Sequence, residues 1–169
     1  MATGILVSEE EYLHTAYEPD CEFEDGVLIE RNVGTWEHGT LQAALAAYFF
    51  RRRKAWNLHI GTDVRVRARA GKYMIPDLAI VEGPEPTGQV LQTPPLLWIE
   101  ILSPEDRPLR VNRKIKAILE SGAPYVWVID PVTLESDLHT AERHTQLEDG
   151  VLRIPGTRIE VPLSAIFED

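Results

Sequence analysis

Two acidic residues lie near the ends of two almost wholly apolar runs. Asp77 lies in the run 74–81, and Glu100 lies in the run 96–102. Such runs are typical of buried strands in a sheet that is covered on both faces. An ionised carboxylate is costly in that setting unless it is compensated, and a bound metal ion is a usual compensation. Two such acids, followed by a basic segment at 110–116, predict a metal-dependent active site.

Each of these residues also has an ordinary structural interpretation. Asp77 could accept backbone hydrogen bonds at a strand end, since Pro-Asp is common in turns, and Glu100 could pair with an arginine. The presence of both acids in this order favours the metal site over these alternatives. Lys114 taken alone is typical of a solvated helix residue.

Positive charge is concentrated in the middle of an acidic chain. The net charge is −10, yet 13 of the 17 Lys and Arg lie between residues 51 and 116, where only seven acidic residues occur. Both candidate carboxylates lie in this stretch, which fits a phosphate-bearing substrate bound through a metal ion. Arg65, Arg67 and Arg69 alternate along 58–69 and could contact phosphates, although a solvated sheet face gives the same pattern. The run 51–54 is typical of a solvated helix end.

Size and composition predict a single soluble domain spanning residues 1–169. Apolar residues make up 44% of the chain and charged residues 26%, as in globular proteins. No apolar run approaches membrane-spanning length and no signal-peptide pattern is present, so we expect a cytoplasmic protein without a membrane partner. The single cysteine, Cys21, excludes an internal disulfide. The five histidines form no His-x-x-x-His pair, which argues against a zinc enzyme.

The periodicity of the chain predicts a mixed α/β architecture. One helix is expected after each of the capping residues Ser8 and Thr35. A third helix is expected to follow the segment 103–106 and to end at Ser121. Hairpin turns are expected at 25–26 and 149–150, where Asp-Gly occurs. The other expected elements are an alternating strand at 58–69, strands carrying the two acids, a loop at 82–95 and a strand at 125–131. The fold class is therefore an α/β protein with a mixed β-sheet flanked by helices.

The ordered set of motifs resembles the Uma2 (DUF820) family of restriction-endonuclease-like proteins, within the PD-(D/E)XK nuclease superfamily. The resemblance rests on Pro76-Asp77, Glu100-Ile101-Leu102-Ser103-Pro104 and Lys114, eight residues before Gly122. It extends over nearly the whole chain, through Tyr12, Glu24-Asp25-Gly26, Glu37-His38 and Tyr125-Val126-Trp127-Val128-Ile129-Asp130-Pro131. It implies a restriction-endonuclease-like mixed sheet and a Mg²⁺-dependent endonuclease that acts on DNA, with Mn²⁺ as a substitute ion.

The resemblance also implies roles for particular residues. Asp77 and Glu100 would ligate the ion, helped by the backbone carbonyl of Ile101, because hard divalent ions prefer oxygen ligands. Lys114 would hydrogen-bond the attacking water or the scissile phosphate and offset developing charge. Lys116 is the alternative lysine, although it points about 200° round the helix from Lys114.

Other positions extend or depart from the family pattern. Glu37 could reach the metal through water or could simply be a favourable charge at a helix N-terminus, and a capping or core position is expected for His38. Leu102 stands where the wider superfamily has its lysine, and Ile118 stands where the family often has tyrosine. The segment 103–107 is more acidic than usual, which affects substrate handling.

Three functions remain open from the sequence. The first is an active nuclease, expected to be a homodimer because cutting both strands with one site per subunit needs two copies. Trp36, Phe49, Phe50 and Trp56 are more than one helix face can bury, so some of them are candidates for that interface. The second is a catalytically silent module that binds nucleic acid, and the third is an interaction protein that uses the same fold.

Overall fold

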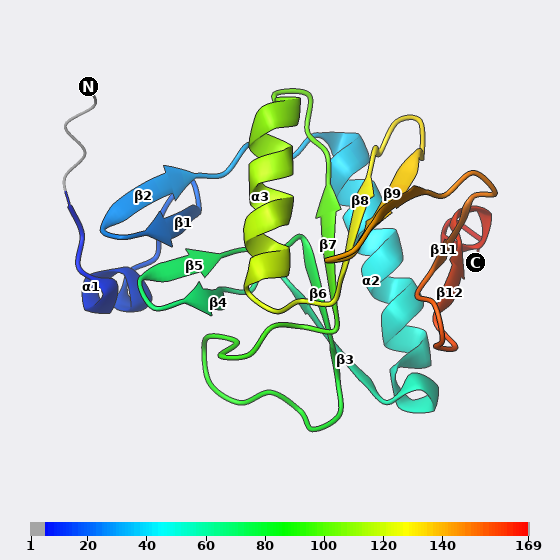
Figure 1. Ribbon diagram of the computed structural model, residues 1–169, viewed down its shortest axis with the longest axis horizontal. Coiled ribbons are helices and arrows are strands. Elements are labelled where there is room, and N and C mark those ends of the chain that lie inside the picture. Colours follow the sequence, from blue (N-terminus) through cyan, green and yellow to red (C-terminus); the bar gives the residue numbers. More distant parts are fainter. Residues whose placement is uncertain (1–5, 169) are drawn as a thin grey trace.

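A computed structural model describes residues 6–168 (Figure 1). Its helices are α1 (Glu9–His14), α2 (Trp36–Trp56), α3 (Pro108–Glu120) and the 3-10 helix η1 (Leu163–Ile166). Its strands are β1 (Cys21–Glu24), β2 (Val27–Glu30), β3 (Leu58–Thr62), β4 (Val66–Arg69), β5 (Lys72–Met74), β6 (Leu78–Glu82), β7 (Leu97–Ile101), β8 (Tyr125–Ile129), β9 (Ser136–His139), β10 (His144–Gln146), β11 (Val151–Arg153) and β12 (Glu160–Pro162). Among these described residues, no helix combines the length and apolarity that crossing a bilayer requires.

A six-stranded mixed sheet forms the centre of the fold, in the order β10-β9-β8-β7-β6-β3. Strands β7 and β8 are parallel, and α3 makes the crossover between them, as parallel neighbours require. The remaining neighbours are antiparallel, including β6 and β7, which are joined by the loop 83–96. The predicted pairing of the Asp77 and Glu100 strands and the predicted mixed α/β class are confirmed.

The two faces of this sheet are covered by different helices, as Figure 1 shows. Residues of α2 such as Leu45 and Phe49 pack on one face, in a core that also contains the C-terminal strands β11 and β12. Residues of α3 such as Ile118 pack on the other face. Strand β7 shows why both faces look apolar in sequence: Ile99 belongs to the α2 core and Trp98 to the α3 core. A strand buried on both faces has no polar alternation.

A smaller antiparallel sheet, β2-β1-β5-β4, lies beside the central sheet on its α3 side. One of its faces packs against α1 through the stacked rings of Tyr12 and Phe23, whose centroids are 4.9 Å apart. Val66 and Met74 join the α3 core and so attach the small sheet to the central one. The hairpin at 25–26 forms as predicted, with both residues at positive φ.

Two sequence expectations for the strands are wrong. The expected strand 58–69 is two strands, because Asp63 takes a positive φ of 51° and turns the chain from the central sheet into the small one. The expected hairpin at 149–150 does not form, because β10 pairs back onto β9 and β11 pairs with β12. The pattern predicted no turn at Asp63, whereas at 149–150 it predicted a turn but the wrong strand partners.

Candidate active site

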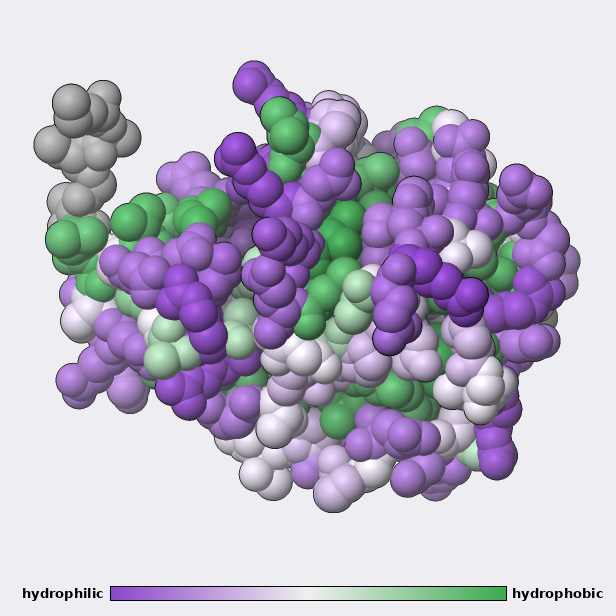
Figure 2. All heavy atoms as spheres, viewed as in Figure 1, coloured by the Kyte–Doolittle hydropathy of each residue, from purple (hydrophilic) through white to green (hydrophobic). Residues whose placement is uncertain are grey.

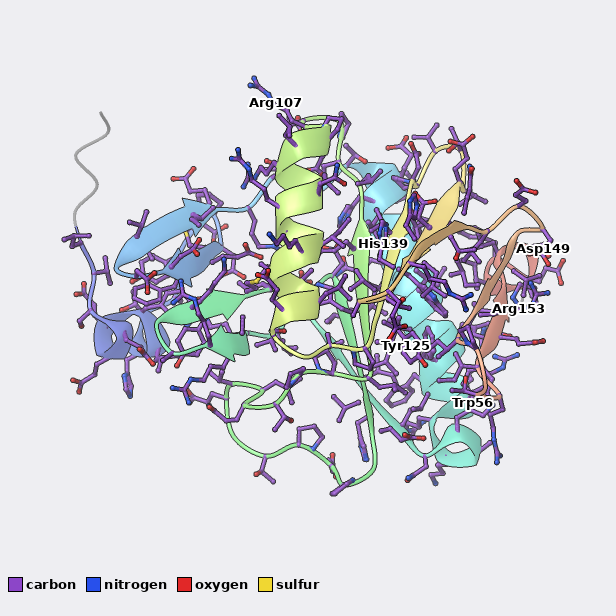
Figure 3. The ribbon with its side chains drawn as sticks, in the orientation of Figure 1. Trp56, Arg107, Tyr125, His139, Asp149 and Arg153 are labelled. Carbon is purple, nitrogen blue, oxygen red and sulfur yellow. The ribbon has the colours of Figure 1, made fainter. Side chains whose placement is uncertain are left out.

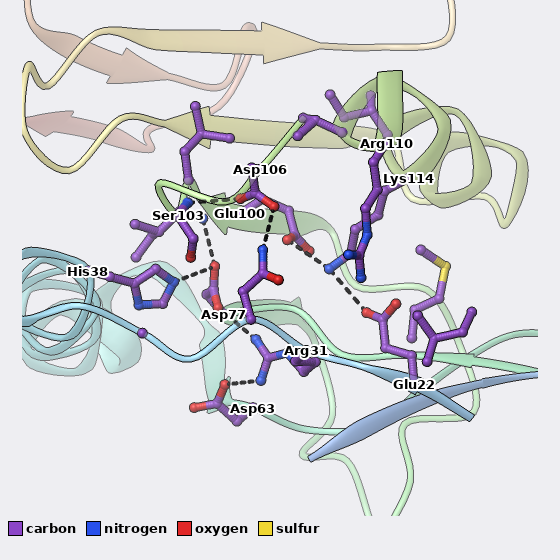
Figure 4. A pocket seen from close by; sticks show the side chains of 18 of the residues that line it. Glu22, Arg31, His38, Asp63, Asp77, Glu100, Ser103, Asp106, Arg110 and Lys114 are labelled. Atoms are coloured by element: carbon purple, nitrogen blue, oxygen red, sulfur yellow. Dashed lines mark hydrogen bonds and ion pairs between the residues drawn. The ribbon is translucent and has the colours of Figure 1, made fainter. Parts of the chain in front are cut away.

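A cleft of about 570 Å³ opens between the small sheet, the N-terminal half of α2 and α3 (Figure 4). Both sequence-predicted acids line it, and so does Lys114. The carboxylates that line the cleft are Glu22, Glu24, Asp63, Asp77, Glu100 and Asp106. Segments far apart in the sequence therefore place their charged side chains in one cavity.

Asp77 lies immediately before β6 and is almost fully buried, with 3% of its side chain exposed. The antiparallel register pairs Leu78 with Ile99, so one further residue sets Asp77 against Glu100. The Asp77 carboxylate accepts hydrogen bonds from the Ile101 backbone N–H at 2.6 Å and from Arg31 at 2.7 Å. The His38 Nε2 atom lies 3.3 Å from Asp77 Oδ2. The protein thus supplies two basic partners and one backbone donor to this one buried acid.

Arg31, just after β2, holds the Asp77 side of the cleft together. Its guanidinium bridges Asp77 and Asp63, with the Asp63 contact at 2.6 Å. The Gln42 amide on α2 donates to Asp63 and to the Asp77 backbone carbonyl at 3.0 Å. The small sheet, the β3–β4 turn and α2 are therefore connected through this one group of polar side chains, which fixes the position of Asp77.

Glu100 projects from the α3 face of β7 into the same cleft. Its carboxylate accepts hydrogen bonds from the Trp98 indole N–H at 2.5 Å and from Lys114 Nζ at 2.8 Å. Lys114 also lies 3.0 Å from Glu22 on β1, and Glu22 in turn accepts the Ile75 backbone N–H. The ammonium of Lys114 is therefore shared between two carboxylates that come from different sheets, as the dashed lines in Figure 4 show.

Burial and charge give these groups different pKa values. Burial raises the pKa of Glu100 to about 7 despite the nearby Lys114, and the charges of Asp77 and Glu22 add to the rise. Burial also opposes the ammonium of Lys114, but the Glu100 and Glu22 carboxylates outweigh it and raise the Lys114 pKa. For Asp77, burial is outweighed by the hydrogen bond and charge of His38, by the Ile101 N–H and by Arg31, so its pKa is lowered.

The donor set of the cleft fits a hard divalent cation. Glu22, Asp77 and Glu100 all present carboxylate oxygens to one cavity, and the charges of Asp77 and Glu22 add to the burial that raises the Glu100 pKa. Ile101 also lines this cavity beside them. Glu37 is exposed and is not among the cleft-lining residues, whereas its neighbour His38 contacts Asp77.

The structure distinguishes the two candidate lysines by position. Lys114 reaches into the cleft, whereas the Lys116 side chain is 76% exposed and lies 3.7 Å from Glu120 on the same helix. Helix α3 buries Ile115 and Ile118 against the central sheet, and this rotation turns Lys114 toward the cleft. The opposite rotation of Lys116 follows from the 3.6-residue repeat.

Comparison with known proteins assigns the family. The Uma2 family model, described as "Putative restriction endonuclease", matches residues 9–163. The chain belongs to the Uma2 family. No curated protein matched the sequence. Among solved structures, a "putative nuclease belonging to DUF820" from Anabaena variabilis ATCC 29413 is similar with a TM-score of 0.79 and 18% identity, covering 95% of this chain and 97% of that one. The restriction-endonuclease-like fold expected from the sequence is therefore confirmed.

Three ionisable residues that contact Asp77 or Lys114 in the Uma2 cleft were not predicted as site residues from the sequence: Glu22, Arg31 and His38. A signal existed for two of them. His38 stands three residues before Leu41 and seven before Leu45, so it lies on the buried face of α2. Arg31 is the only basic residue in the acidic segment 1–37, which marks it as a partner for acids. Glu22 gave no signal, because a short hairpin does not reveal which surface its polar face meets.

Two of the three candidate phosphate-contacting arginines in and just before β4 have structural partners instead. Arg65 donates to the backbone carbonyls of Tyr12 and Thr15 and lies over the Tyr12 ring, so it anchors α1. Arg69 pairs with Asp25. In the run 51–54, Arg52 lies over an aromatic ring, 3.5 Å from the Tyr48 centroid. These contacts favour the structural alternative for much of the basic stretch. Within that stretch, the cations that line the cleft come from α3 and from Lys72 on β5.

Proposed function

We propose that this Uma2 protein is a metal-dependent endonuclease that hydrolyses phosphodiester bonds of DNA. One observation carries the proposal: the ordered set Asp77, Glu100 and Lys114 meets in a single cleft of a chain that belongs to this family. Two carboxylates and a lysine are the groups that phosphodiester hydrolysis needs for holding a cation and for stabilising charge on the phosphate.

Each group has a distinct role in this proposal. Asp77, Glu100 and the Ile101 carbonyl hold Mg²⁺ or Mn²⁺, and Glu22 adds a further oxygen donor from β1. When bound, the ion supplies Lewis acidity and lowers the pKa of a bound water. Lys114 stays protonated, since its pKa is raised, and its ammonium donates to a phosphate oxygen or to the attacking water.

Helix α3 supplies the cations that suit a nucleic-acid backbone. Arg110 and Arg113 line the cleft on the same helix as Lys114, and Arg107 lies at the start of that helix (Figure 3). Arg110 contacts the Glu30 backbone carbonyl at 3.2 Å, which fixes its side chain toward β2. Contacts between such arginine side chains and DNA phosphates would position a duplex without reading its sequence. Binding through them weakens as the salt concentration rises.

The decisive experiment measures DNA cleavage with and without divalent ions. Wild-type protein with Mg²⁺ or Mn²⁺ is expected to cleave DNA, and chelation is expected to stop it. Asp77→Asn and Glu100→Gln are expected to lose both metal binding, measured by calorimetry, and cleavage. Glu120→Gln is the matched control, because Glu120 lies on the exposed side of α3 with 66% of its side chain exposed.

The other functions appear as distinct outcomes of the same assay. Salt-sensitive DNA binding without cleavage of DNA or RNA would identify a silent nucleic-acid-binding module. Absence of both binding and cleavage would favour an interaction protein. Cleavage of RNA alone would keep the nuclease chemistry and change the substrate, because A-form RNA differs from DNA in groove shape and in its 2′-hydroxyls.

We propose that the active form is a homodimer. Of the aromatic residues considered from the sequence, Phe49 is fully buried and Trp56 packs against the core, so neither is free for an interface. Trp36 is 85% exposed at the start of α2, beside the cleft-lining Thr35, and Phe50 is also exposed. Apolar patches on the face drawn in Figure 2 are small and scattered. Light scattering tests the assembly, and Trp36→Ser is expected to weaken the dimer.

A further inference from the structure

The hairpin β9–β10 brings two histidines and an aspartate onto one face at an edge of the central sheet. Asp137 and His139 are two residues apart on β9 and therefore point to the same side. His144 on β10 is the direct cross-strand partner of His139. Leu138, between them in sequence, points to the opposite side and packs in the α2 core. The three polar side chains thus share the α3 side of the sheet, beyond the helix itself.

The ligand atoms of these side chains are close together. One nitrogen of each histidine and one carboxylate oxygen of Asp137 all lie within 4.8 Å of one another. The two imidazole rings are stacked with their centroids 4.4 Å apart and their planes 2° from parallel. His144 Nε2 lies 3.1 Å from Asp137 Oδ1. Figure 3 labels His139 on this hairpin.

We propose that Asp137, His139 and His144 form a binding site for Zn²⁺ or a similar transition-metal dication. Donor atoms on one tetrahedral zinc ion with bonds of about 2.0–2.1 Å lie roughly 3.3 Å apart. The observed donors lie within 4.8 Å of one another, and the stacked rings must tilt toward each other so that both nitrogen lone pairs point at the ion. Two imidazoles and a carboxylate are a common zinc donor set, and they leave one coordination position for water.

This site is chemically distinct from the nuclease cleft. None of its three residues lines that cleft, and its nitrogen donors select transition metals over Mg²⁺. The cleft instead presents carboxylate oxygens, which Mg²⁺ prefers. A metal on the hairpin ties together β9 and β10, and β10 is a fully exposed edge strand of three residues. The expected consequence is a stabilised sheet edge rather than a second catalytic centre.

The test is a Zn²⁺ titration of the full chain by calorimetry with Mg²⁺ in large excess. One equivalent of Zn²⁺ is expected to bind and to shift the ring-proton signals of His139 and His144. Losing an outer-shell partner of a metal ligand typically costs about 10–100-fold in affinity, so losing a direct ligand is expected to cost at least about tenfold. His144→Asn is the first variant, because 58% of its side chain is exposed and its loss leaves the core intact.

Matched controls separate this site from other places where zinc could bind. His14→Asn removes an exposed histidine on α1 and is expected to leave Zn²⁺ binding unchanged. Glu100→Gln alters the cleft and is also expected to leave it unchanged. Zn²⁺ binding that survives His144→Asn but is lost in Glu100→Gln would place the ion in the cleft beside His38 and overturn the proposal. Absence of any Zn²⁺ binding would overturn it as well.

Discussion

The two acids of the cleft lie against each other on adjoining strands, yet they occupy opposite electrostatic environments. Asp77 receives a backbone N–H, an arginine and a histidine, and its pKa is lowered. Glu100 is also buried but shares its lysine with Glu22, and its pKa is raised to about 7. Burial acts in the same direction on both groups, so the difference comes from the number and type of donors that each carboxylate receives.

This difference separates two tasks within one site. The Asp77 side is a fixed anion whose partners come from α2, from β7 and from the residue that follows β2, so the fold determines its position and charge. The Glu100 side holds carboxylates that repel one another around a single ammonium. A cation that binds near Glu100 therefore gains more electrostatic free energy than the same cation bound at Asp77, whose charge is already neutralised by its partners.

The largest effect is expected from removing Asp77. Asp77→Ala leaves Arg31 and His38 close together without the carboxylate that both contact, and breaking a buried pair from one side costs about 3–5 kcal/mol. Urea unfolding followed by circular dichroism measures the change in the free energy of unfolding.

Asp63 provides the matched control for that experiment. Its side chain also contacts Arg31, at 2.6 Å, but it is 46% exposed. An exposed ion pair contributes about 0–1 kcal/mol, so Asp63→Ala is expected to be mild. Equal losses in the two variants would contradict the view that the Asp77 side is a buried, structurally fixed anion.

The second effect concerns catalysis on the Glu100 side. Lys114→Ala is expected to slow DNA cleavage by about 10²–10³-fold, as the loss of one transition-state charge stabiliser typically does. Metal binding, measured separately by calorimetry, is expected to persist because Asp77 and Glu100 remain. Lys116→Ala is the control on the exposed side of α3 and is expected to keep nearly full activity. A dead Lys116 variant beside an active Lys114 variant would reverse the assignment.

These residues also show which parts of the fold the sequence could predict. The acids were expected on neighbouring strands because two apolar runs joined by one loop pair readily in antiparallel fashion. The confirmed β6–β7 pairing follows that local rule. The split of 58–69 at Asp63 was not predictable in the same way, because alternation of side chains continues on either side of a turn and does not reveal that the chain changes sheets.

The site was predictable only where its residues lie on the central sheet or belong to a recognised motif. Asp77, Glu100 and Lys114 were named from the sequence, and the structure brings them to one cleft. Glu22 was not, because its role depends on how the small sheet docks against the central one. That docking is set by the packing of residues such as Val66 and Met74, which carry no sign of it in sequence.

A third effect is a pH dependence of stability that comes from Glu100. Its folded pKa of about 7 lies above its ordinary value of 4.5, so the folded state binds the proton more tightly. This contribution to stability is fully present below about pH 4.5 and is lost as the pH rises through about 7. A shift of this size corresponds to roughly 3 kcal/mol. Urea unfolding across this pH range without divalent ions measures it.

Glu100→Gln removes the titrating group and supplies the control. The free energy of unfolding of wild type relative to Glu100→Gln is expected to fall between pH 4.5 and 7 and then to level off. Asp77 does not produce this slope, because its lowered pKa confines its titration to more acidic pH. A flat difference between the two proteins would show that Lys114 neutralises Glu100 fully.

The smallest effect is expected from His38. The hydrogen bond to Asp77 raises the pKa of His38 against the opposing effect of burial. His38→Gln removes one of three partners of Asp77 and leaves Arg31 and the Ile101 N–H in place, so we expect a cost of about 1–2 kcal/mol below pH 6.5. This cost is expected to shrink as the pH rises through the folded pKa of His38, since the imidazole then loses the charge that strengthens the contact. Unfolding of both proteins at pH 6 and pH 9 measures the change. A cost that grows with pH would mean that the neutral ring is the form Asp77 needs, and the charge on the Asp77 side would then rest on Arg31 alone.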